Sequence, residues 1–314
     1  MGKNLFVIGN GFDLDLGMKT KYSDFANNEK YWPKDDGVEI TGLKAYLEKT
    51  RDLEKWFDME NELRNYAIHD DVPPPHIDSM NSDRDMKYFE KIREKLMEYL
   101  ATQEIIELKT ESVAAKVLKA VYDNGYFKSI YSFNYTDLNN ILKKLCIGQQ
   151  INYTHIHGSI KKKSIILGVD QVRLRDGYDS IQKLNSEFYQ SNSILNDLNN
   201  SDEIIFFGMS FGKIDNLYFE RFLDRITSTD SIPNNRRVIT IFTYNEDSRR
   251  EIIRNISNLG IDMTSLFQND ISFIRTQDNI DSDKLDVFCK RLRGNSISAY
   301  RQNLDKILSK LNDL

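Results

Sequence analysis

The sequence predicts an α/β fold, in which a parallel sheet has helices on both faces and a large helical insertion follows the first strand. Helical patterns lie before or between many strand-like runs, which favours alternating layers of helix and strand. Several of these runs are apolar on both faces, as is typical of strands in a covered parallel sheet. The strand-like runs are residues 4–9, 128–135, 150–158, 164–169, 203–211, 237–244 and 271–275.

The strand and helix patterns divide the chain into three predicted parts. Residues 1–25 and 126–280 carry the strand patterns and are predicted to form the sheet domain. Residues 26–125 carry apolar stripes at helical spacing, so we expect a helical insertion that packs on the sheet. Residues 281–314 are charged, with spaced apolar residues, and predict a C-terminal helix.

Composition and charge limit the function classes. The 314 residues are 40% hydrophobic and 29% charged, which is typical of a soluble globular protein. A formal net charge of −5 gives no global basic footprint, so no nucleic-acid partner is predicted. The two cysteines suit a reducing compartment, and the N-terminus reads as a core strand rather than a signal segment. Because no apolar run could span a bilayer, we expect a cytoplasmic protein without a membrane partner.

The first strand runs straight into Gly9-Asn10-Gly11. Glycines at this point let a ligand or another backbone approach closely, and phosphate is a common ligand at such a turn. The third position of the dinucleotide fingerprint is Leu14 instead of glycine, so a simple tight turn is the alternative. Because the motif follows a strand and precedes a helix-compatible stretch, we predict contact with a pyrophosphate.

Two further strands end in polar side chains. Asn134 lies just past an apolar strand, where open α/β sheets bind ligands, although a cap or turn role is the alternative. His155 and His157 are expected on one face of the next strand because side chains alternate with a period of two. Such a pair can bind a metal, but no third ligand is evident nearby, so no metal is predicted. His157 lies beside a glycine at the strand end and is the leading candidate for a general base.

Glu60 and Ser210 each have competing interpretations. Glu60 lies on the apolar stripe of its predicted helix, either as a salt bridge into the sheet domain or as a group reaching the cleft. Ser210 lies in a G-x-S-x-G sequence after a strand, which is the pattern of a serine nucleophile. All four histidines precede Ser210, whereas hydrolases with that pattern have theirs after the serine. We therefore favour a turn that bonds a ribose or phosphate, and a serine hydrolase is the lesser alternative.

The order of the motifs resembles one protein family. GNGFD-x-x-x-G-x-x-T-x-Y-x-D-F follows the first strand, and W-x-D-x-E, F-N-Y-T, H-x-H-G-S and G-x-S-F come after it in that order. Together they resemble the AbiH family of bacterial abortive-infection proteins, over roughly residues 4–225. That family is similar to the sirtuin-like fold that binds nicotinamide dinucleotides, so the resemblance implies a Rossmann-like nucleotide-binding domain.

The resemblance implies a site for NAD. Asn134 would contact the nicotinamide ribose and position the attacking water, and His157 would be the catalytic histidine. The sirtuin pattern has an acid two residues after the asparagine, where this chain has Thr136. Two cysteines cannot form the four-cysteine zinc module of sirtuin deacetylases, so neither metal nor deacetylation is expected. The residues implied to bind NAD are Gly9, Asn10, Gly11, Asp13, Thr20, Tyr22, Phe25, Asp137, Gly208 and Ser210.

Two functional hypotheses follow. In the first, the chain is an enzyme of phage defence that hydrolyses NAD to ADP-ribose and nicotinamide. In the second, the same pocket is a non-catalytic sensor of NAD or ADP-ribose, which the departure at Thr136 motivates. Uncontrolled loss of NAD would kill healthy cells, so the resemblance also implies a gate, meaning a mechanism that keeps the activity off in uninfected cells. We expect this gate to be a homo-oligomer or a partner defence protein.

Overall fold

The described strands form one parallel sheet. The computed structural model describes residues 3–33, 41–53, 58–69, 81–124, 127–148, 150–170, 172–189, 192–212, 216–228 and 237–294. Within these ranges the order across the sheet is β3-β2-β1-β4-β5-β6, and each neighbouring pair is parallel. This is the strand order of a doubly wound, Rossmann-like fold, so the predicted fold class is confirmed. The strands are β1 (Lys3–Ile8), β2 (Phe127–Ser132), β3 (Thr154–His155), β4 (Ser201–Phe207), β5 (Val238–Thr243) and β6 (Asp270–Arg275).

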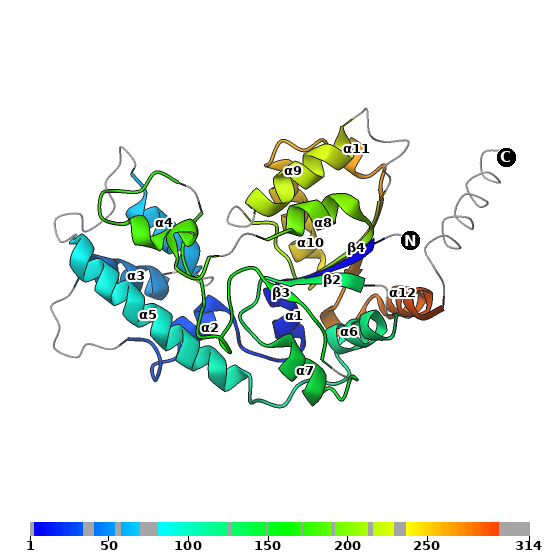
Figure 1. Ribbon diagram of the computed structural model, residues 1–314, viewed down its shortest axis with the longest axis horizontal. Helices are drawn as coiled ribbons and strands as arrows, with labels where there is room; N and C mark the ends of the chain where they lie inside the picture. The colour runs from blue at the N-terminus through cyan, green and yellow to red at the C-terminus, as the bar shows by residue number, and fades with distance from the viewer. Residues whose placement is uncertain are drawn as a thin grey trace.

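Both faces of the sheet are covered by helices (Figure 1). Successive side chains of a strand point to opposite faces, and β1 is buried on both. Phe6 and Ile8 pack in one apolar cluster, whereas Leu5 and Val7 pack in another. On one face lie α1 (Asn10–Asp15), α6 (Val113–Asn124), α7 (Leu138–Lys144) and α12 (Ser282–Gly294); on the other lie α8 (Ile194–Asn200), α9 (Asn216–Thr227), α10 (Glu246–Ser257) and α11 (Met263–Leu266).

A second body of helices lies beside the sheet, on the left of Figure 1. Its helices are α2 (Tyr22–Ala26), α3 (Gly42–Leu53), α4 (Met59–Ala67) and α5 (Ser82–Gln103). They share an apolar core with residues 165–181, which come from much later in the chain. We call α2–α5 together with residues 165–170 and 172–183 the helical module. Its core therefore joins two segments that the sequence separates by α6, β2, α7 and β3.

The predicted strand at residues 164–169 is wrong. Ile165, Leu167 and Val169 are buried in the core of the helical module, so their apolar pattern reflects packing against helices. An apolar run of this length cannot be assigned to a strand by periodicity alone. The predicted C-terminal helix is described from Ser282 to Gly294, and residues 295–314 lie outside the described ranges.

Candidate functional site

The turn after β1 contacts the turn after β4. A Cβ added to Gly11 would lie 2.5 Å from the Gly208 Cα, and one added to Gly9 would lie 2.7 Å from the Gly208 carbonyl oxygen. The Gly9 N–H donates to the Phe207 carbonyl at 2.8 Å, and the Gly11 N–H donates to the Gly208 carbonyl at 3.1 Å. The two glycines are thus required by the approach of two backbones, a reason that involves no phosphate.

Asn134 joins the end of β2 to α1. Its Nδ2 donates to Asp13 Oδ1 at 2.8 Å and to the Gly9 carbonyl at 3.1 Å. Thr136 Oγ1 donates to the second carboxylate oxygen of Asp13, also at 2.8 Å. Asp13 is buried, with 1% of its surface exposed. The segments that follow β1 and β2 therefore share one buried polar network.

Two acids in this network bind protons more tightly than free carboxyl groups do. Burial raises the pKa of Asp13 to about 7, and the charge of Glu104 adds to the rise, whereas the hydrogen bonds from Thr136 and Asn134 oppose it. Burial also raises the pKa of Glu104, although its carboxylate accepts from the Asp137 N–H at 2.6 Å. A strongly perturbed carboxyl group such as Asp13, soon after the end of β1, marks a candidate functional site.

His155 ties β3 to the same network. Its Nδ1 donates to the Asn134 carbonyl at 2.9 Å, because a carbonyl oxygen can only accept. Its Nε2 lies 3.1 Å from the Tyr153 hydroxyl, which in turn donates to Asp137 Oδ1 at 2.8 Å. Burial lowers the pKa of His155. Tyr153 lies just before β3, and no local sequence pattern identified it as part of this network.

Asp137 begins α7 as its N-cap. Oδ1 accepts from the Asn139 N–H at 3.0 Å, and Oδ2 accepts from Lys161 Nζ at 2.9 Å. Burial alone would raise the pKa of Asp137, but the bonds from Lys161, Tyr153 and the Asn139 N–H outweigh it and lower that pKa. This residue, predicted to bind NAD, thus has a structural role at a helix start.

His157 lies in different surroundings from His155. β3 ends at His155, so the alternation of side chains that was predicted to place both histidines on one face does not continue to His157. The His157 ring packs edge-on against Phe133, with 5.3 Å between ring centroids, and lies 6.2 Å from the ring of Tyr218 on α9. It is 6% exposed. His157 therefore lies just past β3, beside the residue that precedes Asn134.

The remaining residues of the first motif divide between the turn and the helical module. Thr20 Oγ1 donates to the side chain of Asn10, which is exposed, at 2.6 Å. The Tyr22 hydroxyl lies 3.3 Å from that of Tyr135. Phe25 is fully buried and packs on other aromatic rings of the module. Asn10 and Thr20 thus offer polar atoms to solvent near Gly9, whereas the Phe25 side chain contributes packing.

The turn after β4 lacks the geometry of a serine nucleophile. In such enzymes the serine lies on the strained residue of a strand-to-helix turn. Here the positive φ angles are those of Gly208 (68°) and Phe211 (52°), on either side of Ser210. Ser210 is exposed, its Oγ accepts from the Gly212 N–H at 3.3 Å, and its carbonyl accepts from Asn255. These contacts favour a turn over a nucleophile.

Glu60 forms a buried ion pair. Asp58 caps the start of α4, and Glu60 follows on the buried face of the helix. Its Oε2 accepts from Lys183 Nζ at 3.0 Å, and its Oε1 accepts from the Gly168 N–H at 3.3 Å. Glu60 and Lys183 are 7% and 3% exposed. Of the two interpretations of Glu60, the salt bridge is therefore present, and it joins α4 to the later segment of the helical module.

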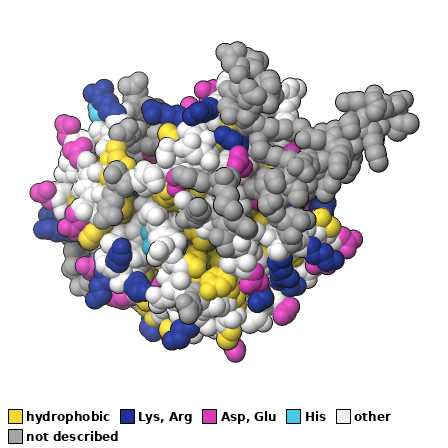
Figure 2. All heavy atoms as spheres, turned by 45° about the vertical axis from the view of Figure 1, so that its right-hand side comes forward, with side chains coloured by type: hydrophobic (Ala, Val, Ile, Leu, Met, Phe, Trp, Pro, Cys, Tyr) yellow, Lys and Arg dark blue, Asp and Glu magenta, His cyan; other side chains and the backbone are white. Residues whose placement is uncertain are grey.

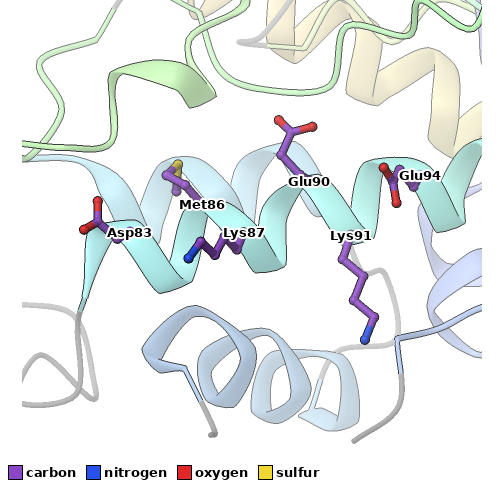
Figure 3. Close-up of a pocket in the computed structure, with 6 residues that line it drawn as sticks. All are labelled: Asp83, Met86, Lys87, Glu90, Lys91 and Glu94. Atoms are coloured by element: carbon purple, nitrogen blue, oxygen red, sulfur yellow. The ribbon is translucent and has the colours of Figure 1, made fainter. Parts of the chain in front are cut away.

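A groove of about 690 Å³ runs along α5 but contains none of the predicted site residues. Figure 3 shows its charged side chains spreading from the helix in several directions. A small-molecule site needs a few convergent polar groups, which this groove does not supply. The lining residues are Asp83, Met86, Lys87, Glu90, Lys91 and Glu94.

The surface shown in Figure 2 has mixed charge, with lysine and arginine interspersed among aspartate and glutamate. This agrees with the net charge of −5 and gives no basic stripe on that face. Within the described ranges, no cluster of three His, Cys, Asp or Glu residues is arranged to hold a metal ion. No helix in those ranges has the length and apolar character needed to cross a membrane.

The sheet order and the polar network define a Rossmann-like α/β protein with a candidate site at the carboxyl ends of β1, β2 and β3. A family model described as bacteriophage abortive infection AbiH matches residues 5–235, and the chain belongs to this family. No curated protein matches the chain.

Some solved structures are loosely similar. A triple mutant of a Sir2 homologue in complex with 2′-O-acetyl ADP ribose is 12% identical, with a TM-score of 0.39 over 94% of this chain and 95% of that chain. A mutant Sir2 homologue in complex with ADP ribose is 12% identical, with a TM-score of 0.31 over 83% and 95%. The fold assignment rests on the strand order itself.

Proposed function

We propose that the chain hydrolyses NAD to nicotinamide and ADP-ribose in defence against bacteriophage. The observation that supports this proposal is that Asn134 bonds the glycine turn at the end of β1, while His157 packs on Phe133, the residue before Asn134. In doubly wound sheets, ligands bind outside the carboxyl ends of the strands where the order reverses, here between β1 and β4. Membership of the AbiH family supports the role in defence.

The proposed reaction needs positioning more than acid catalysis. The bond from ribose C1′ to nicotinamide breaks with its electron pair going to the positively charged ring, which leaves neutral. A water oxygen then bonds to C1′ and loses a proton. His157 would accept that proton, a role typically worth about 10²–10⁴-fold in rate. Holding the ribose and the water in place would supply much of the remaining rate acceleration.

The other predicted contacts lie on the diphosphate and adenosine side. Asn10 and Thr20 would face the diphosphate from the exposed side of the first turn, because the Gly9 and Gly11 N–H groups already donate to carbonyl oxygens. Gly208 and Ser210, at the end of β4, would border the adenosine. The proposed site thus spans the reversal point of the sheet.

The test is nicotinamide release from NAD by the purified full chain, followed by chromatography. We expect release by the wild type and by His69→Ala, a control histidine just after α4 whose backbone N–H donates to the Arg173 carbonyl. We expect little release by Asn134→Ala or His157→Ala, provided that each melts like the wild type. Equal release by a double Asn134→Ala/His157→Ala variant would contradict the site.

A non-catalytic sensor of NAD or ADP-ribose is the second candidate. The observation that favours it is that both N–H donors of Asn134 are occupied within the chain. Calorimetry that shows tight NAD binding, with intact NAD recovered after long incubation, would support the sensor. Absence of both binding and release would contradict both functions.

A further inference from the structure

We infer that Asp13 is a positioning residue that fixes the orientation of the Asn134 side-chain amide, so that Asn134 faces its ligand with an acceptor only. The effect on catalysis rests on the function proposed above, whereas the orientation itself does not. Asp13 is 1% exposed, so it acts through Asn134 and not by touching a substrate.

The inference begins with the two hydrogens of the Asn134 amide. One is donated to Asp13 Oδ1 at 2.8 Å, and the other is donated to the Gly9 carbonyl at 3.1 Å. Both acceptors are oxygens that cannot donate when Asp13 is ionised. A flipped amide would place its own oxygen against two acceptors, so only one orientation satisfies all three groups.

This orientation has a chemical consequence at the site. With both hydrogens committed, Oδ1 is the atom that Asn134 can offer to a ligand, and it lies on the opposite side of the amide from Nδ2. The group that meets Asn134 must therefore be a donor, such as a water molecule or a ribose hydroxyl. A phosphate oxygen or the carboxamide carbonyl of nicotinamide would meet an acceptor there.

Asp13 is itself held by a second donor. Thr136 Oγ1 bonds its Oδ2 at 2.8 Å, so each carboxylate oxygen accepts from a neutral side chain at the end of β2. Protonation of Asp13 would introduce a competing donor and weaken the preference for one amide orientation. The charged group acting on Asp13 is Glu104, whose neighbours include Asp137, Lys144 and Lys161.

The experiment compares Asp13→Asn with Asp15→Asn, a matched acid on the same helix. Asp15 Oδ2 accepts from the Ala114 N–H at 2.7 Å, away from Asn134. In the wild type, the side-chain amide NMR signal of Asn134, identified by its loss in Asn134→Ala, should shift with a midpoint between about pH 6 and pH 8. Because His155, whose pKa burial lowers, also bonds the Asn134 carbonyl, the informative part of the shift is the one with a midpoint near pH 7. That part should persist in Asp15→Asn and be absent in Asp13→Asn.

The kinetic arm uses nicotinamide release. Asp13→Asn should lower kcat by up to about 100-fold with little change in KM, because the reacting groups are misaligned rather than lost. Thr136→Val, which leaves both Asp13 and Asn134 in place, should lower kcat by less and provides a second variant if Asp13→Asn does not fold. An Asn134 signal that does not change with pH, or a kcat unchanged in both Asp13→Asn and Thr136→Val, would overturn the inference. If the wild type releases no nicotinamide, the proposed function fails, and the NMR arm still decides the orientation.

Discussion

Asp13 at the strand ends and Glu60 in the helical module are both buried carboxylates, and they are stabilised in different ways. In the module, Glu60 accepts from the ammonium group of Lys183. At the strand ends, the side-chain donors to Asp13 among the described residues are the neutral groups of Asn134 and Thr136. The first pairing balances a charge with a charge, and the second leaves a buried negative charge without a cation beside it.

This difference distinguishes a structural role from a functional one. A buried acid with a matched base joins two segments, here α4 and the residues near Lys183. Asp13, whose donors are neutral, has a pKa raised to about 7 by burial, so it can change its charge near neutral pH. Natural folds retain such uncompensated groups mainly where activity requires them.

The largest expected effect concerns the module. Lys183→Met removes the cation and leaves Glu60 buried, so we expect a loss of about 3–5 kcal/mol in the free energy of unfolding. Chemical denaturation at neutral pH measures this loss. Adding Glu60→Gln to Lys183→Met should recover much of it, because glutamine is neutral and can still accept from the Gly168 N–H. No recovery would mean that packing, and not charge, dominates at Lys183.

The second prediction concerns the pH dependence of stability at the strand ends. The pKa of Asp13 rises from 3.8 to about 7 on folding, so the folded chain holds this proton more tightly than the unfolded chain does. The contribution of Asp13 to the free energy of unfolding therefore falls as pH rises from about 4 to about 7. At about 1.4 kcal/mol per pKa unit, the total fall is roughly 4 kcal/mol. Denaturation across that range should show a flatter profile for Asp13→Asn than for the wild type.

Other groups titrate in the same range, so the difference between the two profiles is the informative quantity. The lowered pKa of His155 acts in the opposite direction, because a histidine that prefers its neutral form gains stability as pH rises. His155 is common to both proteins. Identical profiles for wild type and Asp13→Asn would contradict the contrast between Asp13 and Glu60.

The sequence predicted the site as far as local patterns allow. Apolar runs located β1 and β2, and the polar residues after them, including Asn134, follow from where parallel strands end. The glycine that follows His157 singled it out in the sequence. In the structure this residue, Gly158, has a φ angle of 76°, which favours glycine. Each of these signals lies within a few residues of the group it identifies.

The partnerships between distant segments could not be predicted. Asp13 meets Thr136 across 123 residues, and Glu60 meets Lys183 across the same separation. The glycines after β1 suggested a phosphate because the approach of Gly208 is visible only in three dimensions. Likewise, residues 164–169 match a buried strand, and only their contacts with the helical module reveal their surroundings. Local pattern identifies which groups are unusual, and tertiary contacts decide what they do.

The smallest expected effect tests how far the polar network extends from Asp13. Tyr153→Phe removes a hydroxyl that contacts Asp137, His155 and the Leu138 N–H. Because Tyr153 is only partly buried, we expect a loss of about 1 kcal/mol in unfolding free energy, measured by denaturation. The pKa of Asp137 should also rise, since Tyr153 is one of the donors that lower it.

Tyr31→Phe is the matched control, because Tyr31 contacts its neighbours through its ring, which packs edge-on against Tyr99. We expect this control to change stability by less than about 0.5 kcal/mol. If both substitutions had equal effects, the Tyr153 hydroxyl would contribute nothing beyond ring packing. The polar network that begins at Asp13 would then extend no further than His155. The contrast between Asp13 and Glu60 would depend on Asp13, Asn134 and Thr136 alone.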